Sequence, residues 1–211
     1  AEEAFAHAKE ELIRRAPPPL FWLFGKSQSG KSSIVRYLTG LTDISIGLGF
    51  RPTTRQSAIY DFPSSEAPLL RFLDTRGLGE VAYDPAEDIA FCEGRSHLIL
   101  AVAKAMDNQQ QVVLDVIAAA RRAHPDWPVV GAQTSPHEGY PQGAGHLLPY
   151  PFAEGALGAD LPAPLSQAVS YRRGLFGSLP GRGGVSFVPI DFTHAEDGFE
   201  PADYGHEALI A

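Results

Sequence analysis

Apolar and polar positions along this chain group into segments that predict strands and helices in alternation. Short apolar runs between turn residues are typical of buried strands, and apolar residues three or four positions apart are typical of helices. The predicted strands are 20–24, 56–62, 69–73, 96–103, 127–132 and 185–190. The predicted helices are 1–16, 33–38, a short one within 78–94, 109–123, 165–176 and one that starts near 203. This alternation predicts an α/β fold in which helices cover both faces of a mostly parallel sheet.

Three finer features follow from the same pattern. The strands 56–62 and 69–73 are adjacent in sequence, and their pair is where we expect one antiparallel edge strand. The segment 40–52 has mixed polarity and three glycines, which predicts a mobile loop. In the helix 109–123 the apolar face is predicted to consist of Val112, Val116, Ala119 and Ala123.

The strand 20–24 runs into Gly25-Lys26-Ser27-Gln28-Ser29-Gly30-Lys31-Ser32, and Ser33 then starts the next helix. A glycine-rich loop between a strand and a helix is the setting of a phosphate-binding P-loop. Its backbone N–H groups point at the phosphates, and the helix N-terminus adds partial positive charge. Lys31 can reach the β- and γ-phosphates, and the Ser32 hydroxyl can bind Mg²⁺. The segment 25–33 therefore predicts a nucleoside triphosphate site.

The predicted strand 69–73 runs directly into Asp74-Thr75-Arg76-Gly77. A carboxylate at the carboxyl end of a strand beside a P-loop is placed to organise Mg²⁺. The backbone N–H of Gly77 is predicted to approach a terminal phosphate.

The order of the segments 25–32, Thr53-Thr54-Arg55 and 74–77 resembles the Walker A, switch I and switch II series of Era-like bacterial GTPases of the TRAFAC class. The resemblance covers the first half of the chain closely and the rest in outline. It implies a Ras-like, three-layer P-loop fold that binds GTP or GDP with Mg²⁺. It also implies that Thr54 completes the metal coordination, with Thr53 as the alternative.

The guanine-recognition motif of such GTPases, Asn-Lys-x-Asp, is replaced here. Aligning on the strand end places Gln133-Thr134-Ser135-Pro136 at that position, so Pro136 stands where the base-binding carboxylate is expected. Gln133 and Thr134 remain candidate base contacts, and Glu138 is a candidate substitute for the carboxylate. Asp191-Phe192-Thr193 takes the place of the Ser-Ala-Lys motif, with its backbone available to the base.

Leu78 follows Gly77, where Ras-type enzymes place a glutamine that orients water. A leucine cannot polarise water, so hydrolysis is predicted to need K⁺ held near Gln28, or a partner molecule, including a second copy in a nucleotide-dependent dimer. Arg55 and Arg76 are further candidates for stabilising charge.

The segment 135–164 holds six prolines and five glycines. It is too long for an ordinary connection, and we expect an ordered insertion beside the base-binding end of the site. Its histidines, His137 and His146, are possible metal ligands together with Glu138, but no helical or hairpin spacing supports such a site. We divide the chain into a helix with a proline linker, 1–19, and a GTPase domain, 20–211.

Composition and charge narrow the function further. The net charge is −8, from 17 basic and 25 acidic residues, which argues against general nucleic-acid binding. Cys92 is the only cysteine, and we expect a reducing, cytoplasmic location. The chain starts at Ala1 without methionine and ends within a helical pattern. We therefore expect a piece of a longer protein, with any membrane attachment provided by segments outside this chain.

The sequence thus predicts a Mg²⁺-dependent GTPase with slow turnover that acts as a switch on an unidentified protein effector. GTP would order the loops 47–54 and 77–94, and hydrolysis would release them. One alternative is a nucleotide-gated binding module with negligible turnover. The other is an ATP-using P-loop enzyme such as a kinase, against which stand Thr54, the segment 74–77 and the lack of an arginine-rich lid.

Overall fold

The computed structural model describes residues 18–40, 49–52, 57–64, 68–75, 86–92, 96–153, 157–193 and 198–211. The strands in these residues are β1 (Leu20–Phe24), β2 (Gly49–Pro52), β3 (Ser57–Phe62), β4 (Leu70–Thr75), β5 (Ser96–Lys104), β6 (Val129–Thr134) and β7 (Val185–Ile190). The helices are α2 (Lys31–Thr39), α4 (Ala86–Cys92), α5 (Gln111–Ala123), the 3₁₀ helix η1 (Pro136–Gly139), α6 (Ala163–Gly177) and α7 (His206–Ile210). The helix predicted for 1–16 lies outside the described residues.

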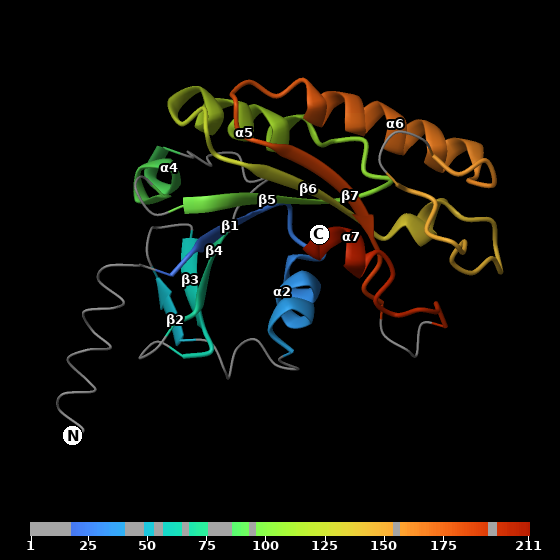
Figure 1. Ribbon diagram of the computed structural model, residues 1–211, viewed down its shortest axis with the longest axis horizontal. Coiled ribbons are helices and arrows are strands. Elements are labelled where there is room, and N and C mark those ends of the chain that lie inside the picture. Colours follow the sequence, from blue (N-terminus) through green and yellow to red (C-terminus); the bar gives the residue numbers. More distant parts are fainter. Residues whose placement is uncertain are drawn as a thin grey trace.

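The seven strands form one sheet in the order β2-β3-β4-β1-β5-β6-β7 (Figure 1). β1 lies at its centre and pairs in parallel with β4 and β5. β3 pairs antiparallel with both β2 and β4, so it is the one strand of this sheet that runs against the others. The mostly parallel sheet is confirmed, but the antiparallel strand is not at the edge because β2 lies outside it.

The strand β2 corrects the prediction of a loop over 40–52. Residues 49–52 pair with 58–61 of β3, from Gly49 opposite Asp61 to Pro52 opposite Ala58. Glycine and proline are unfavourable in strand interiors, so the local sequence carries no strand signal. The partner strand supplies the hydrogen bonds, and an edge position tolerates proline.

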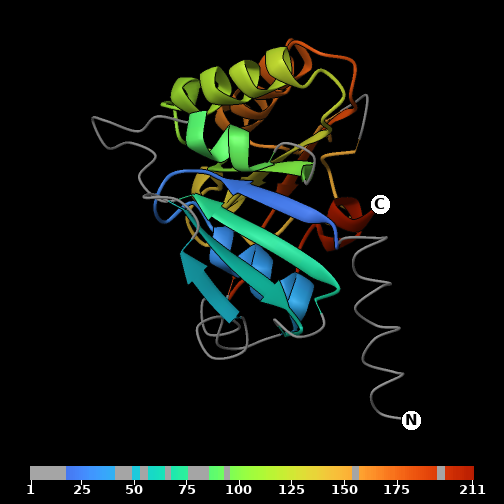
Figure 2. The same ribbon diagram turned by 90° about the vertical axis from the view of Figure 1, so that its left-hand side faces the viewer.

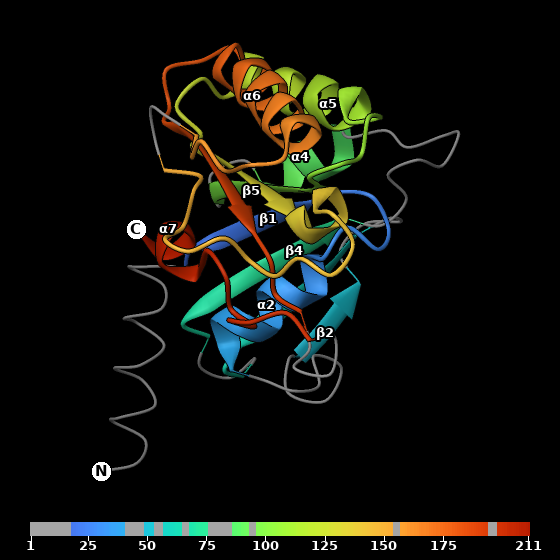
Figure 3. The ribbon, with the colours of Figure 1, turned by 90° about the vertical axis from the view of Figure 1, so that its right-hand side faces the viewer.

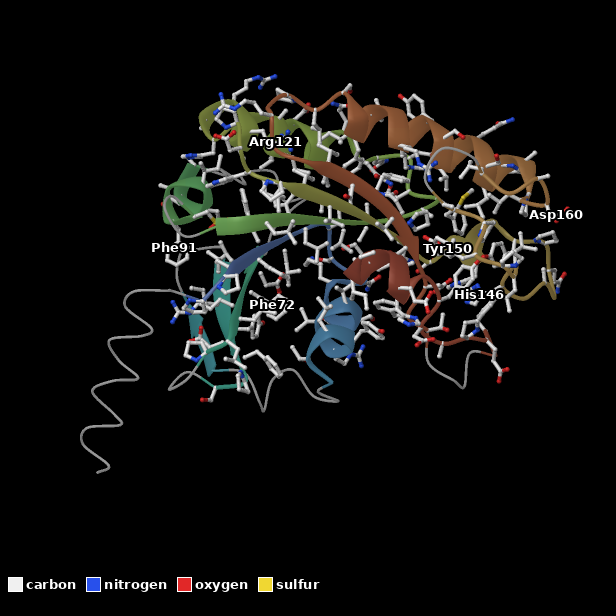
Figure 4. The ribbon with its side chains drawn as sticks, viewed as in Figure 1. Phe72, Phe91, Arg121, His146, Tyr150 and Asp160 are labelled. Atoms are coloured by element: carbon white, nitrogen blue, oxygen red, sulfur yellow. The ribbon has the colours of Figure 1, made fainter. Side chains whose placement is uncertain are left out.

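Helices cover both faces of the sheet, as Figures 1 and 2 show: α4, α5 and α6 lie on one side, and α2 and α7 on the other. The alternation along β1 explains this arrangement, since Trp22 and Phe24 pack in the core with α5 while Leu23 packs in the core with α2. Phe72 of β4 belongs to the α2 side (Figure 4). None of the described helices is both long and apolar enough to cross a membrane.

The buried face of α5 differs from the predicted one. Its buried apolar residues are Val113, Leu114, Val116, Ile117 and Ala120. Of the four predicted residues only Val116 is among them, and Val112 is 51% exposed. Apolar residues surround much of this helix, so periodicity alone allows two faces and the contact with the sheet selects one.

Arg121, in the last turn of α5, is 1% exposed (Figure 4). Its guanidinium donates hydrogen bonds to the backbone carbonyl oxygens of Pro180, Gly183 at 2.8 Å and Trp127 at 3.0 Å. Burial lowers the pKa of Arg121. The side chain therefore holds the turn before β7 against the end of α5, in addition to any interaction with the helix dipole.

The insertion 135–164 contains η1 and the first residues of α6, and its other described residues form neither helix nor strand. Phe152 and Leu161 are buried against Leu165 of α6 and Tyr204. The Tyr150 hydroxyl donates to the Pro189 carbonyl of β7 at 2.6 Å. Packing of this kind places the insertion along the β7 side of the sheet, near α7 (Figures 3 and 4).

Candidate nucleotide site

The loop between β1 and α2 has the backbone that a P-loop requires. Gln28 and Gly30 adopt left-handed conformations, with φ of 60° and 94°. Gly25 lies so close to β5 that an added Cβ would stand 2.1 Å from the Val102 carbonyl oxygen, so only glycine fits there. The loop thus curls tightly over the carboxyl end of β1.

Lys31 begins α2 and turns back over this loop. Its ammonium donates to the carbonyl oxygens of Gly25 at 2.7 Å and Lys26 at 2.9 Å. An ammonium has three N–H donors, so these two contacts leave one for a phosphate. Burial lowers the pKa of Lys31, and the nearby charge of Asp74 acts in the opposite direction.

Two of the predicted Mg²⁺ ligands, Ser32 and Asp74, lie among the described residues. β4 lies beside β1, with Asp74 in register with Leu23, which brings the Asp74 carboxylate to the end of the sheet where the loop begins. Ser32 is exposed in the first turn of α2. Carboxylate and hydroxyl oxygens are the donors that Mg²⁺ prefers, so these two residues fit the ion. Thr54 and Gly77 lie outside the described residues.

Thr134, at the end of β6, connects the loop to the rest of the sheet. Its hydroxyl donates to the Ser29 carbonyl at 2.7 Å. An added Cβ on Gly30 would stand 3.0 Å from the Thr134 methyl group, so the two chains are in close contact. Ser27 is exposed and Ser29 is buried in this loop. The contact from Thr134 fixes the side of the loop that faces β6.

We expect Thr134→Val to lower the free energy of unfolding by about 1–3 kcal/mol, because the buried Ser29 carbonyl loses its hydrogen bond. Nucleotide affinity should fall as well, since the loop is less well held. Urea unfolding of Thr193→Val is the matched control, because the Thr193 hydroxyl is buried without a hydrogen-bond partner among the described residues. Equal losses in the two variants would contradict this role of Thr134.

A cavity of about 190 Å³ lies beside the loop. The start of α2 contributes its N-cap Gly30 and Ser33, and the end of β6 and the segment after it contribute Thr134 and His137. The end of β7 contributes the wall that includes Asp191. The cavity is small, and its position next to Gly30 suits the base and sugar of a nucleotide whose phosphates occupy the loop.

Only some of the residues that the sequence alignment placed at the base line this cavity. Thr134 lines the cavity, but Gln133 is fully buried and accepts a hydrogen bond from the Gln110 amide at 3.1 Å. Pro136 is buried at the start of η1 and is not among the lining residues. Glu138 pairs with Lys104 at 2.7 Å and does not line the cavity either.

His137 lines the cavity, whereas the alignment had placed Pro136 at the base. Ser135 has a left-handed backbone with φ of 53°, which turns the chain after β6 before η1 begins. After this turn, His137 lies at the cavity wall. A strand boundary estimated from the sequence does not reveal this turn.

His137 pairs there with Asp191, for which the sequence predicts only a backbone contact with the base. The His137 ring Nδ1 lies 2.5 Å from Asp191 Oδ2, and the backbone N–H of His137 donates to the same oxygen at 3.3 Å. Asp191 is 2% exposed. Burial raises the pKa of Asp191, and the contacts from His137 act in the opposite direction.

The alternative of a metal bound by the insertion finds no support in the described residues, which hold no cluster of three His, Cys, Asp or Glu side chains that could bind an ion. His137 is engaged by Asp191, and Glu138 by Lys104. His146 stacks on Tyr204, with ring centres 4.1 Å apart, and its Nδ1 lies 3.3 Å from the Tyr140 hydroxyl. Burial lowers the pKa of His146.

The opposite side of the loop borders a smaller cavity of about 130 Å³, which Lys26, Ser27 and Gln28 help to line. Lys26 forms an ion pair with Asp107 at 2.8 Å. The side chain of Gln28 is exposed at this position. A role of Gln28 in holding K⁺ stays a prediction.

No protein-family model matches the sequence, and no curated protein matches it either. Among solved structures, the chain is similar to an ADP-ribosylation factor-like GTP-binding protein, the small COPII coat GTPase SAR1 of Encephalitozoon cuniculi, in complex with GDP. The two are 15% identical, with a TM-score of 0.52, over 89% of this chain and 79% of that one. A GTP-binding protein of the archaeon Sulfolobus solfataricus, also with GDP, is 12% identical with a TM-score of 0.44 over 99% of this chain and 55% of that one.

At 15% identity the first similarity shows a common fold alone, and a TM-score of 0.44 is too low to carry an argument. Together with the sheet order, the similarity to the SAR1 structure confirms the predicted Ras-like P-loop fold. The first of these neighbours is a small GTPase, and the narrower resemblance to Era-like GTPases stays a prediction.

Proposed function

We propose that this protein binds GTP and GDP at the loop 25–32 and hydrolyses GTP as a nucleotide-controlled switch. The observation that carries this proposal is that one tight loop has a lysine ammonium over one end and a cavity beside the other. Lys31 closes the phosphate end of the loop, and Gly30 forms part of the cavity wall. A ligand with phosphates at one end and a flat ring at the other matches both parts.

The residues around the loop have distinct tasks in this proposal. The backbone N–H groups between Gly25 and Ser32 bind the phosphate oxygens, and the Lys31 ammonium adds a full positive charge close to them. Mg²⁺ would be held by Ser32 and Asp74, with Thr54 as a further ligand, and would neutralise charge on the phosphates. Gly77 would donate its backbone N–H to the terminal phosphate.

In the proposed switch, the loops 47–54 and 77–94 become ordered when the terminal phosphate is present. Contacts from Thr54 and Gly77 to the γ-phosphate would form only with the triphosphate, so hydrolysis would remove the free energy that holds these loops in place. An effector protein that binds the ordered loops would then distinguish the two nucleotide states.

Equilibrium binding of fluorescent GTP, GDP and ATP, with Mg²⁺ and with excess EDTA, tests the proposed function. We expect both guanine nucleotides to bind, and EDTA to weaken GTP more than GDP, because the γ-phosphate adds charge that the metal neutralises. Failure of all three nucleotides to bind would refute the proposal. Binding of ATP with no measurable binding of GTP would instead support the kinase-like alternative.

A further inference from the structure

A buried carboxylate, that of Asp191 at the end of β7, lines the cavity beside the P-loop. Its backbone is fixed as well as its side chain, because the Asp191 N–H donates to the Tyr204 carbonyl at 2.9 Å. The His137 ring that holds the carboxylate is itself stacked on Phe199, with ring centres 4.5 Å apart. The carboxylate is therefore held rigidly before any ligand arrives.

The two oxygens of this carboxylate have different surroundings. Oδ2 receives both contacts from His137, one from the ring and one from the backbone. Oδ1 accepts no hydrogen bond from the described residues. A buried carboxylate gains free energy when its remaining acceptor sites are filled, so a ligand in the cavity that offers an N–H group would be bound preferentially.

We propose that Asp191 recognises the base of the bound nucleotide and selects guanine over adenine, with His137 positioning the carboxylate. The inference rests on the proposed nucleotide-binding function and adds to it the group that determines base specificity. In this arrangement the carboxylate comes from the end of β7. In GTPases with the Asn-Lys-x-Asp motif it comes from the segment that corresponds to the one after β6.

The chemistry of the purine edges gives the direction of the preference. Guanine presents two kinds of N–H donor on its Watson–Crick edge, at N1 and at the 2-amino group, and a carboxylate accepts from either. Adenine presents an acceptor at N1 and no N–H at position 2, so a carboxylate that faces these two positions is repelled, and its 6-amino donor lies at the other end of the edge. Xanthine carries an oxygen at position 2 in place of the amino group, so a carboxylate disfavours it too.

The number of available oxygens sets the size of the preference. Because Oδ2 is engaged by His137, mainly Oδ1 is available to the base. A single charged hydrogen bond corresponds to a preference of about 10- to 100-fold. That is far below the roughly 10⁴-fold or greater rejection that fully hydrogen-bonded sites achieve. Guanine specificity should therefore be real but weaker than with the complete motif.

The test measures binding of fluorescent GDP, ADP and xanthosine diphosphate with Mg²⁺ to the full chain and two variants. Asp191→Asn keeps the size of the side chain and can still accept the His137 contacts through its amide oxygen. Its amide NH₂ then faces the base and suits the xanthine oxygen. Glu138→Gln is the matched control, because this carboxylate lies next to His137 in sequence but pairs with Lys104 outside the cavity.

We expect the unmodified protein to bind GDP about 10- to 100-fold more tightly than ADP, and xanthosine diphosphate no better than ADP. Asp191→Asn should lose the preference for GDP, gain affinity for xanthosine diphosphate and bind ADP at least as tightly as the unmodified protein does. Glu138→Gln should behave like the unmodified protein. An unchanged ratio of GDP to ADP affinity in Asp191→Asn, or loss of that ratio in Glu138→Gln, would overturn the inference.

A substitution at a buried position can prevent folding, so circular dichroism of Asp191→Asn accompanies the binding data. If this variant does not fold, competition by inosine and xanthosine diphosphates on the unmodified protein decides. Equal affinity for GDP and xanthosine diphosphate then overturns the inference, and an order of GDP, inosine diphosphate, xanthosine diphosphate supports it. Tight but equal binding of GDP and ADP overturns only this inference, whereas binding of neither nucleotide overturns the proposed function with it.

Discussion

Replacing Lys31 by alanine should remove most of the affinity for nucleoside triphosphates while leaving the fold intact. The ammonium lies over the loop, within 2.9 Å of two of its carbonyl oxygens, and is partly withdrawn from water. A charge-assisted contact to phosphate in such a position is worth about 2–5 kcal/mol. Titration of fluorescent GTP into the variant measures the loss.

The fold should survive this substitution because the Lys31 side chain packs on the loop and not in either core of the sheet. Lys104→Ala provides the control for a lost lysine, since Lys104 is paired with Glu138 and is 40% exposed. We expect its affinity for GTP to match that of the unmodified protein. Unchanged GTP affinity in Lys31→Ala, with an unaltered circular dichroism spectrum, would contradict the assigned role.

Hydrolysis by the protein alone should be slow, and a monovalent cation or self-association should accelerate it by roughly 10³–10⁵-fold. Phosphoryl transfer requires an attacking water in line with the bond that breaks and a positive group near the leaving oxygens. Leu78 follows Gly77 in the sequence and has no group that orients water. Gln28 is the candidate ligand of a cation, with its exposed side chain on the P-loop.

Phosphate release measured in KCl and in NaCl, over a range of protein concentrations, separates the two routes. Dependence on K⁺ that disappears in Gln28→Ala would support a cation at this residue. A rate per molecule that rises with protein concentration would support a group supplied by a second copy. Gln111→Ala, which changes an exposed glutamine paired with Asp115, should leave turnover unchanged. Fast turnover that is indifferent to salt and concentration would contradict both routes.

The sequence by itself determined the features that depend on neighbours along the chain. A buried strand such as 185–190 follows from its run of apolar residues, and its observed bounds are Val185–Ile190. The P-loop follows from glycines and Lys31 at fixed spacing between a strand and a helix. The position of Asp74 at the carboxyl end of β4 follows from its place directly after an apolar run. In each case the physical cause is local, because backbone conformation and burial of one segment decide the outcome.

The tertiary structure decided the features that depend on residues distant in sequence. β2 exists because β3 offers it a partner, and the buried face of α5 is the one that meets the sheet. The contact between His137 and Asp191 joins residues 54 positions apart. No local pattern relates them, since each sits at the end of a different strand. They meet because β6 and β7 are parallel neighbours, which brings their carboxyl ends to the same edge of the sheet.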